Sequence, residues 1–269
     1  MGLGCLPERP TLARPTAYRP AYHRPGPLGT LQTPLSLAAR YGHDGLVKLL
    51  LELEDIIPDM ADNDGRTPLS WAAEMGRDGV VELLLGWDEA KPDMRDNSGR
   101  TPFSWAAGNG HCVVVKLLLG REEVKSDIPD HSGRTPFSWA AGNGHGVVVN
   151  LLLGREEVKP DMCDNSGLTP FSWAAMNGHG VVVKLLLGRE EVKPDMPDDS
   201  GLTPFSWAAR NGHDGVVRLL LGGENVNPNI PDIDNRTPLL WASIRGHSRI
   251  VELLLERKDV NPNISQNGG

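Results

Sequence analysis

Residues 99–132 read GRTPFSWAAGNGHCVVVKLLLGREEVKSDIPDHS, and residues 133–166 reproduce 28 of these 34 positions. The Thr-Pro pair of this unit occurs seven times at an unbroken interval of 34 residues, with its threonine at Thr33, Thr67, Thr101, Thr135, Thr169, Thr203 and Thr237. A fixed period of this size indicates that one supersecondary unit has been copied. One copy is too small to bury its own apolar face, so we expect neighbouring copies to cover one another in a stack.

The first half of each unit predicts a helix of about two turns. Thr101 suits the N-cap, and Pro102 suits the first helical position because its missing N–H would find no partner there. Phe103 and the Ala-Ala pair that follows make one apolar stripe, and Gly110 can adopt the left-handed conformation that ends a helix.

The second half predicts another short helix over residues 113–119, VVVKLLL, which is apolar around almost its whole circumference. A short valine-rich run can also be a buried strand, but this one lacks a period-2 face and turns at both ends. Helices this short are unstable alone, so their order must come from packing between units. Residues 120–133 are rich in Pro, Asp, Ser and Gly and predict a projecting loop or β-turn finger.

These motifs resemble the ankyrin repeat: Thr-Pro-Phe/Leu, Ala-Ala, Gly-His, Val-Val-x-Leu-Leu-Leu, and Asp-x-x-Gly before the next Thr-Pro. The tetratricopeptide repeat shares the 34-residue period, but its Trp-x-x-Leu-Gly-x-x-Tyr signature is missing. The unit is one residue longer than the ankyrin norm, Ser104 replaces the usual His, and Trp105 replaces an aliphatic residue. The resulting Ser-Trp-Ala-Ala version is similar to arrays that are frequent in fungal proteins.

The resemblance implies an all-α ankyrin-repeat solenoid over residues 28–269, made of seven helix–turn–helix units with projecting fingers. The last finger is truncated at Gly269, which suggests a shortened gene product or a fragment of a longer array. Residues 1–27 form a Pro/Arg-rich tail with Arg-Pro at 9–10, 14–15, 19–20 and 24–25, and we expect this tail to be disordered.

The net charge of the chain is −8, and the first 30 residues carry four arginines against Glu8, so the array itself is at −11. An acidic array repels phosphate backbones, so we expect no nucleic-acid ligand. No apolar run is long enough for a membrane span or a secretory signal. Three cysteines without a Cys-x-x-Cys pair indicate free thiols. We therefore expect a monomer in the cytoplasm, with a nuclear location also possible.

The recurring histidines do not predict a metal site. Equivalent atoms in stacked helices lie about 8–10 Å apart, whereas the ligands of one zinc ion lie within about 2.1 Å of it. The resemblance implies instead that a histidine such as His111 bonds nearby backbone. Every polar motif is repeated, and nothing unique combines a nucleophile, a base and an orienting group, so we predict no enzyme, no catalytic residue and no cofactor.

One tryptophan recurs in each of six units, at Trp71, Trp105, Trp139, Trp173, Trp207 and Trp241. On a helical wheel Trp105 lies about 200° from Phe103, so its ring points away from the apolar stripe. Either the rings form a structural ladder between adjacent first helices, or they floor the concave groove. The large area that a tryptophan can bury favours the ladder.

Positions that differ between otherwise matching units are our candidates for partner binding, because packing of the framework does not dictate them. They lie at the end of the first helix and in the finger, which the resemblance places on a concave groove. These candidates are Tyr41, Met75, Asn109, His131, Asn143, Asn165, Met176, Asn177, Asp199, Arg210, Asn211 and Arg245. Drift on a solvated surface is the alternative explanation.

The sequence thus predicts a non-enzymatic scaffold that binds a partner protein through the concave groove of the array. The alternative is the regulatory or sensing arm of a larger signalling protein, such as an NTPase-driven receptor. The basic or neutral surface of a protein would suit the acidic array best.

Overall fold

The computed structural model describes residues 32–87, 90–223 and 225–264, and the tail at residues 1–27 lies outside them. The described part of the chain contains fourteen α-helices and no strand. The helices follow one another in seven pairs, which confirms the all-α solenoid of seven helix–turn–helix units.

The first helices of the units are α1 (Pro34–Tyr41), α3 (Pro68–Glu74), α5 (Pro102–Gly108), α7 (Pro136–Gly142), α9 (Pro170–Met176), α11 (Pro204–Asn211) and α13 (Pro238–Arg245). The second helices are α2 (Asp44–Leu51), α4 (Asp78–Leu85), α6 (Cys112–Leu119), α8 (Gly146–Leu152), α10 (Gly180–Leu187), α12 (Asp214–Leu221) and α14 (Ser248–Leu255).

Each first helix begins as its sequence predicts. In α7 the Oγ1 of Thr135 accepts a hydrogen bond from the backbone N–H of Ser138 at 3.1 Å, and Pro136 takes the first helical position. The other six threonines cap their helices in the same way. Thr-Pro is therefore the start signal of every unit.

One apolar core runs along the whole stack. Phe103, Phe137, Phe171 and Phe205 are fully buried at equivalent positions, and the valines and leucines of the second helices pack against them. Buried residues of all seven units belong to this one cluster, from Leu35 to Val260, so no described unit has a separate core. Stability is consequently shared between neighbours.

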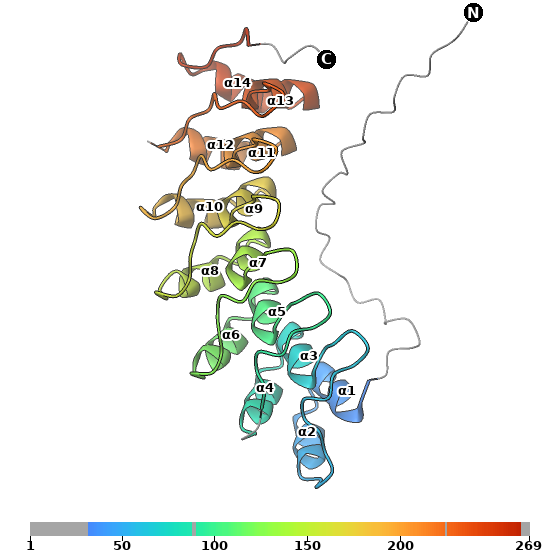
Figure 1. The fold of residues 1–269 in the computed structure, drawn as a ribbon. Helices are drawn as coiled ribbons and strands as arrows, with labels where there is room; N and C mark the ends of the chain where they lie inside the picture. The colour runs from blue at the N-terminus through green and yellow to red at the C-terminus, as the bar shows by residue number, and fades with distance from the viewer. Residues whose placement is uncertain (1–31, 88–89, 224, 265–269) are drawn as a thin grey trace, which may run out of the picture.

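The stack curves, and the first helices lie on its inner side while the second helices lie on its outer side (Figure 1). First helices of adjacent units pack more closely than second helices do. The Ala-Ala pair of each first helix allows this close approach, whereas branched side chains cover the second helices. Small residues on one column and large ones on the other therefore produce the curvature.

A tight turn forms the finger between consecutive units. In the finger that precedes α5, Asp96 Oδ1 accepts hydrogen bonds from the backbone N–H groups of Ser98 and Arg100, both at 2.9 Å. Gly99 has φ +84°, a left-handed conformation that glycine adopts without strain. Neighbouring fingers are joined by backbone bonds such as Asn97 N–H to Asp64 O at 2.9 Å.

Candidate functional site

An aspartate of the finger holds each tryptophan of the first helices. Trp139 Nε1 donates to Asp130 Oδ2 at 2.9 Å, and Asp130 Oδ1 accepts from the backbone of its own finger. The other pairs have the same nine-residue separation and distances of 2.8–2.9 Å: Asp62–Trp71, Asp96–Trp105, Asp164–Trp173, Asp198–Trp207 and Asp232–Trp241. Each aspartate thus joins a finger to an inner helix.

The tryptophans lie inside the stack. Trp139 is half-buried, and the other five expose no more than 9% of their surface. A ring that is so covered, with its only polar atom bonded to a carboxylate, acts in packing, as in a ladder of rings between adjacent first helices. The rings leave little area for a partner to contact.

Arginines alternate with these rings to form a column of stacked cations and indoles. The guanidinium carbon of Arg66 lies 4.5 Å from the Trp71 ring centre and 4.1 Å from that of Trp105. Arg100 is inserted in the same way between Trp105 and Trp139, at 3.5 and 4.2 Å. Cation–π contacts this short and this buried stabilise by about 1–2 kcal/mol each.

The column changes character from the fifth to the seventh unit, where apolar residues cluster with Trp173, Trp207 and Trp241. Leu168 and Leu202 occupy the positions at which other units have arginine, and Met176 packs with them against Trp173 and Trp207. All three replacements are buried. An apolar joint therefore interrupts the arginine column at this point.

The size and charge of the residue that follows Ala-Ala correspond to those of the residue that precedes Thr-Pro in the same unit. A Cβ on Gly108 would lie 2.8 Å from Arg100 Nη2, so this glycine leaves room for the guanidinium. Glu74 instead forms an ion pair of 2.6 Å with Arg66. Met176 accompanies Leu168, which has no charge to accommodate. Packing thus explains part of the variation that the sequence suggested for partner recognition.

Four of the candidate asparagines join adjacent units. The Nδ2 atoms of Asn109, Asn143, Asn177 and Asn211 donate to backbone carbonyls of the preceding unit, at Glu74, Gly108, Gly142 and Met176 respectively. These bonds measure 2.6–3.1 Å and are half-buried, so they contribute to the stack. The spacing of 35 residues between the partners hides them from a local reading of the sequence.

Histidines bond the same carbonyls. His111 Nε2 lies 2.8 Å from Glu74 O and His213 Nε2 lies 2.8 Å from Met176 O, and since a carbonyl only accepts, Nε2 is the donor. Burial lowers the pKa of His145 and His179, although the hydrogen bonds to Gly108 and Gly142 oppose this shift. The lowered pKa values favour the neutral imidazole of His145 and His179 in the folded state.

Exposed candidates remain along the inner side and the fingers. His131, Asn165 and Asp199 lie at finger tips, and all three are exposed. Tyr41 is 58% exposed at the end of α1, and Arg245 is exposed at the end of α13. Met75 is half-buried, Met176 is buried, and Arg210 is half-buried between the rings of Trp207 and Trp241.

Two exposed isoleucines extend this surface in the last unit. Ile233, at a finger tip, is 72% exposed, and Ile244, at the end of α13, is 52% exposed. Exposed apolar side chains beside an exposed arginine are typical of surfaces that bind proteins.

A family model for ankyrin repeats in three copies matches the chain at residues 23–96, 88–161, 148–232 and 171–266. Since these matches cover most of the sequence, the chain belongs to the ankyrin repeat family. Ankyrin repeats are in general protein-interaction modules. Comparison with curated proteins returned no significant match.

Across residues 32–87, 90–223 and 225–264, no helix is long and apolar enough to cross a membrane. In the same ranges no three His, Cys, Asp or Glu side chains are grouped closely enough to hold a metal ion.

Proposed function

We propose that this chain is a non-enzymatic scaffold that binds a partner protein through its inner surface and finger tips. The observation that carries this proposal is that some repeated positions hold the stack together with constant residues, whereas the exposed finger tips vary. The Trp–Asp bond links the framework in the same way in six units and the Asn bond in four, whereas finger tips change from His131 to Asn165 to Asp199.

The last unit contributes two exposed apolar side chains to this surface. Ile233 and Ile244 place apolar area in solvent on neighbouring segments, next to Arg245. Apolar groups in the centre of an interface supply most of its binding energy, and charges at its rim set orientation and rate. The charge of −11 on the array favours a partner with a neutral or basic surface.

Cross-linking mass spectrometry on the intact chain in cell extract would identify a partner and the contacted residues. We expect cross-links on the finger tips and the ends of the first helices. The double variant Ile233→Asp/Ile244→Asp should lower recovery of that partner at least about tenfold, because two apolar contacts are replaced by charges. Turnover of a substrate by the purified chain would contradict the non-enzymatic proposal.

Val147→Asp is the matched control, since Val147 is 70% exposed on α8 of the outer column. This variant should recover the partner as the unmodified chain does. If Val147→Asp abolished recovery while the isoleucine variant retained it, binding would belong to the outer surface and our proposal would be wrong.

A further inference from the structure

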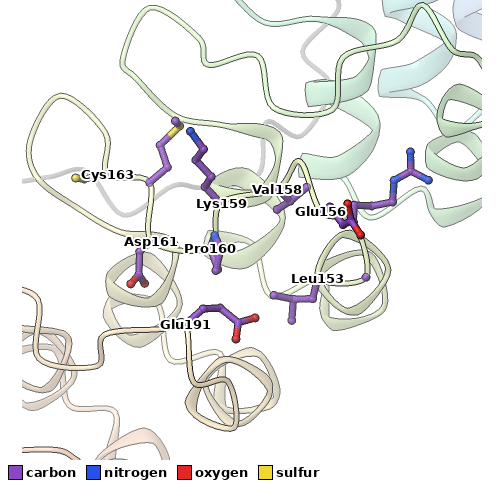
Figure 2. A pocket seen from close by; sticks show the side chains of 11 residues that line it. Leu153, Glu156, Val158, Lys159, Pro160, Asp161, Cys163 and Glu191 are labelled. Atoms are coloured by element: carbon purple, nitrogen blue, oxygen red, sulfur yellow. The ribbon is translucent and has the colours of Figure 1, made fainter.

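A cavity of about 710 Å³ opens at the edge of the stack, among the loops that follow α8 and α10. Its apolar lining comes from Leu153, Val158, Pro160 and Met162. Figure 2 shows Asp161 and Glu191 on one side of Pro160, while Lys159 extends to the opposite side. The cavity therefore combines an apolar wall with the carboxylates of Asp161 and Glu191 on this side, and Glu156 also lines it.

Both oxygens of Asp161 accept the backbone N–H of Lys193, at 3.3 and 3.0 Å. Among the described residues, no ion pair to a basic side chain involves Asp161 or Glu191. Burial raises the pKa of Asp161, and the negative charge of Glu191 raises it further, although Lys193 opposes both through its backbone N–H and its charge. Arg155, which also lines the cavity, is paired with Glu157 at 2.9 Å. A cation that entered the cavity would consequently be attracted by both carboxylates.

We propose that this cavity binds an Arg-Pro motif of the chain's own N-terminal segment, residues 1–27. The proline ring would pack on Pro160 and Leu153, and the guanidinium would lie between Asp161 and Glu191. That segment repeats Arg-Pro four times and contains no lysine and only one acidic residue, Glu8. Its positive charge complements the acidic array, and planar guanidinium groups suit carboxylates.

The length of the segment selects which motif can reach the cavity. The cavity lies between the fourth and fifth units, about 30 Å from the first unit when adjacent helices are about 8–10 Å apart. In an extended proline-rich conformation Arg24 would be about 25 Å from Gln32, Arg19 about 40 Å and Arg14 about 56 Å. Arg19-Pro20 and Arg14-Pro15 are therefore long enough to reach within one chain, whereas Arg24-Pro25 is not.

Disulfide trapping tests this contact in the full chain, because Cys163 lines the cavity and is exposed. A variant with Thr16→Cys and Cys5→Ser carries a thiol beside Arg14-Pro15. Under mild oxidation we expect that thiol to link to Cys163 in preference to Cys112, as read by peptide mapping. A link between two copies, with no link within one chain, would overturn the proposal that the segment binds its own chain.

The substitutions Asp161→Asn and Glu191→Gln should lower the yield of the Cys163 link by at least about threefold, the effect of losing two exposed ion pairs. Asp93→Asn with Glu123→Gln is the control, since this equivalent pair lies two units away and lines no part of the cavity. Equal linking to both cysteines, or equal loss in both double variants, would overturn the proposal. Either result leaves binding at the inner surface untouched.

Discussion

The indole ring of Trp139 is the residue on which most of one unit's polar and apolar contacts converge. It packs against Arg100 and Arg134 and donates to Asp130. Trp139→Ala should therefore lower the free energy of unfolding by about 3–5 kcal/mol. Urea unfolding followed by circular dichroism measures this loss. An unchanged midpoint with lost partner binding would place the ring in the binding surface.

Trp139→Phe separates the hydrogen bond from the ring. The phenyl ring retains most of the stacking area but leaves Asp130 Oδ2 without its donor, so we expect a smaller cost of about 1–3 kcal/mol. If both variants lost the same stability, the bond to Asp130 would account for the whole effect and the stacking for none.

The sequence revealed the tryptophan series but not its partners. The nine-residue spacing from Asp130 to Trp139 is repeated in six units and is a usable signal. The asparagine bonds are harder to foresee, because Asn143 contacts a carbonyl 35 residues away in the preceding unit. Periodicity shows that a position matters, but only packing shows which neighbour it contacts.

Acid should weaken the array through His145 and His179. Burial lowers the folded-state pKa of both histidines below the ordinary 6.5 of the unfolded chain. Between the folded-state and unfolded-state pKa values, the unfolded chain therefore binds more protons than the folded one. Their contribution to stability is therefore complete above about pH 6.5 and is lost as pH falls through the folded-state pKa. The double variant His145→Gln/His179→Gln should show a flatter loss of stability between about pH 7 and 5, measured by urea unfolding at each pH.

Buried carboxylates give the opposite pH dependence of stability, at lower pH. Burial raises the pKa of Asp59, Asp93, Asp161 and Asp195, so their contribution is present below about pH 3.8 and is lost as pH rises through the folded-state values. Because the histidine variant retains these aspartates, their effect cancels in the comparison. Identical pH slopes for the two proteins would refute the role of the histidines.

At the scale of the helix, the position of a glycine decides whether its replacement by alanine stabilises or destabilises the array. Gly178, between α9 and α10, has φ +79°, and a Cβ there would lie 2.6 Å from His213 Nδ1. Gly178→Ala should cost about 1–2 kcal/mol or more, through backbone strain and the displaced imidazole. A Cβ on Gly215, in the first turn of α12, would meet no side chain within 4 Å.

Gly215→Ala should consequently stabilise the array by up to about 1 kcal/mol, because alanine has the higher helix propensity. Thermal unfolding of the two variants beside the unmodified chain provides the measurement. Destabilisation by both would mean that α12 requires the glycine for a reason other than space or conformation.

Helix limits were the most predictable part of the fold. Thr-Pro marks the start of each first helix, and the apolar run from Val113 to Leu119 lies within α6, which begins one residue earlier at Cys112. The curvature and the inner position of the first helices follow from contacts between units. Those contacts depend on the relative size of Ala-Ala and Leu-Leu-Leu in three dimensions.

Across the whole molecule, the units differ in how many apolar side chains they bury. In α2 only Val47 is buried, and Leu46 and Leu49 are exposed, whereas α6 buries Val114, Val115 and Leu118. The first unit also has Leu37 where the others have tryptophan, so it lacks the aspartate–indole bond. Since each unit is stabilised mainly by its neighbours, a unit with fewer buried groups at one end should open first.

Native-state hydrogen exchange measured by mass spectrometry tests this order. Amides of α1 and α2 should exchange fastest, those of α13 and α14 more slowly, and those of α5 to α10 slowest, because the central helices have covered neighbours on both sides. A gradient of this kind means that opening spreads inward from the first unit. Equal protection from α1 to α14 would instead show that the array opens in a single step, and the nearest-neighbour account of its stability would then fail.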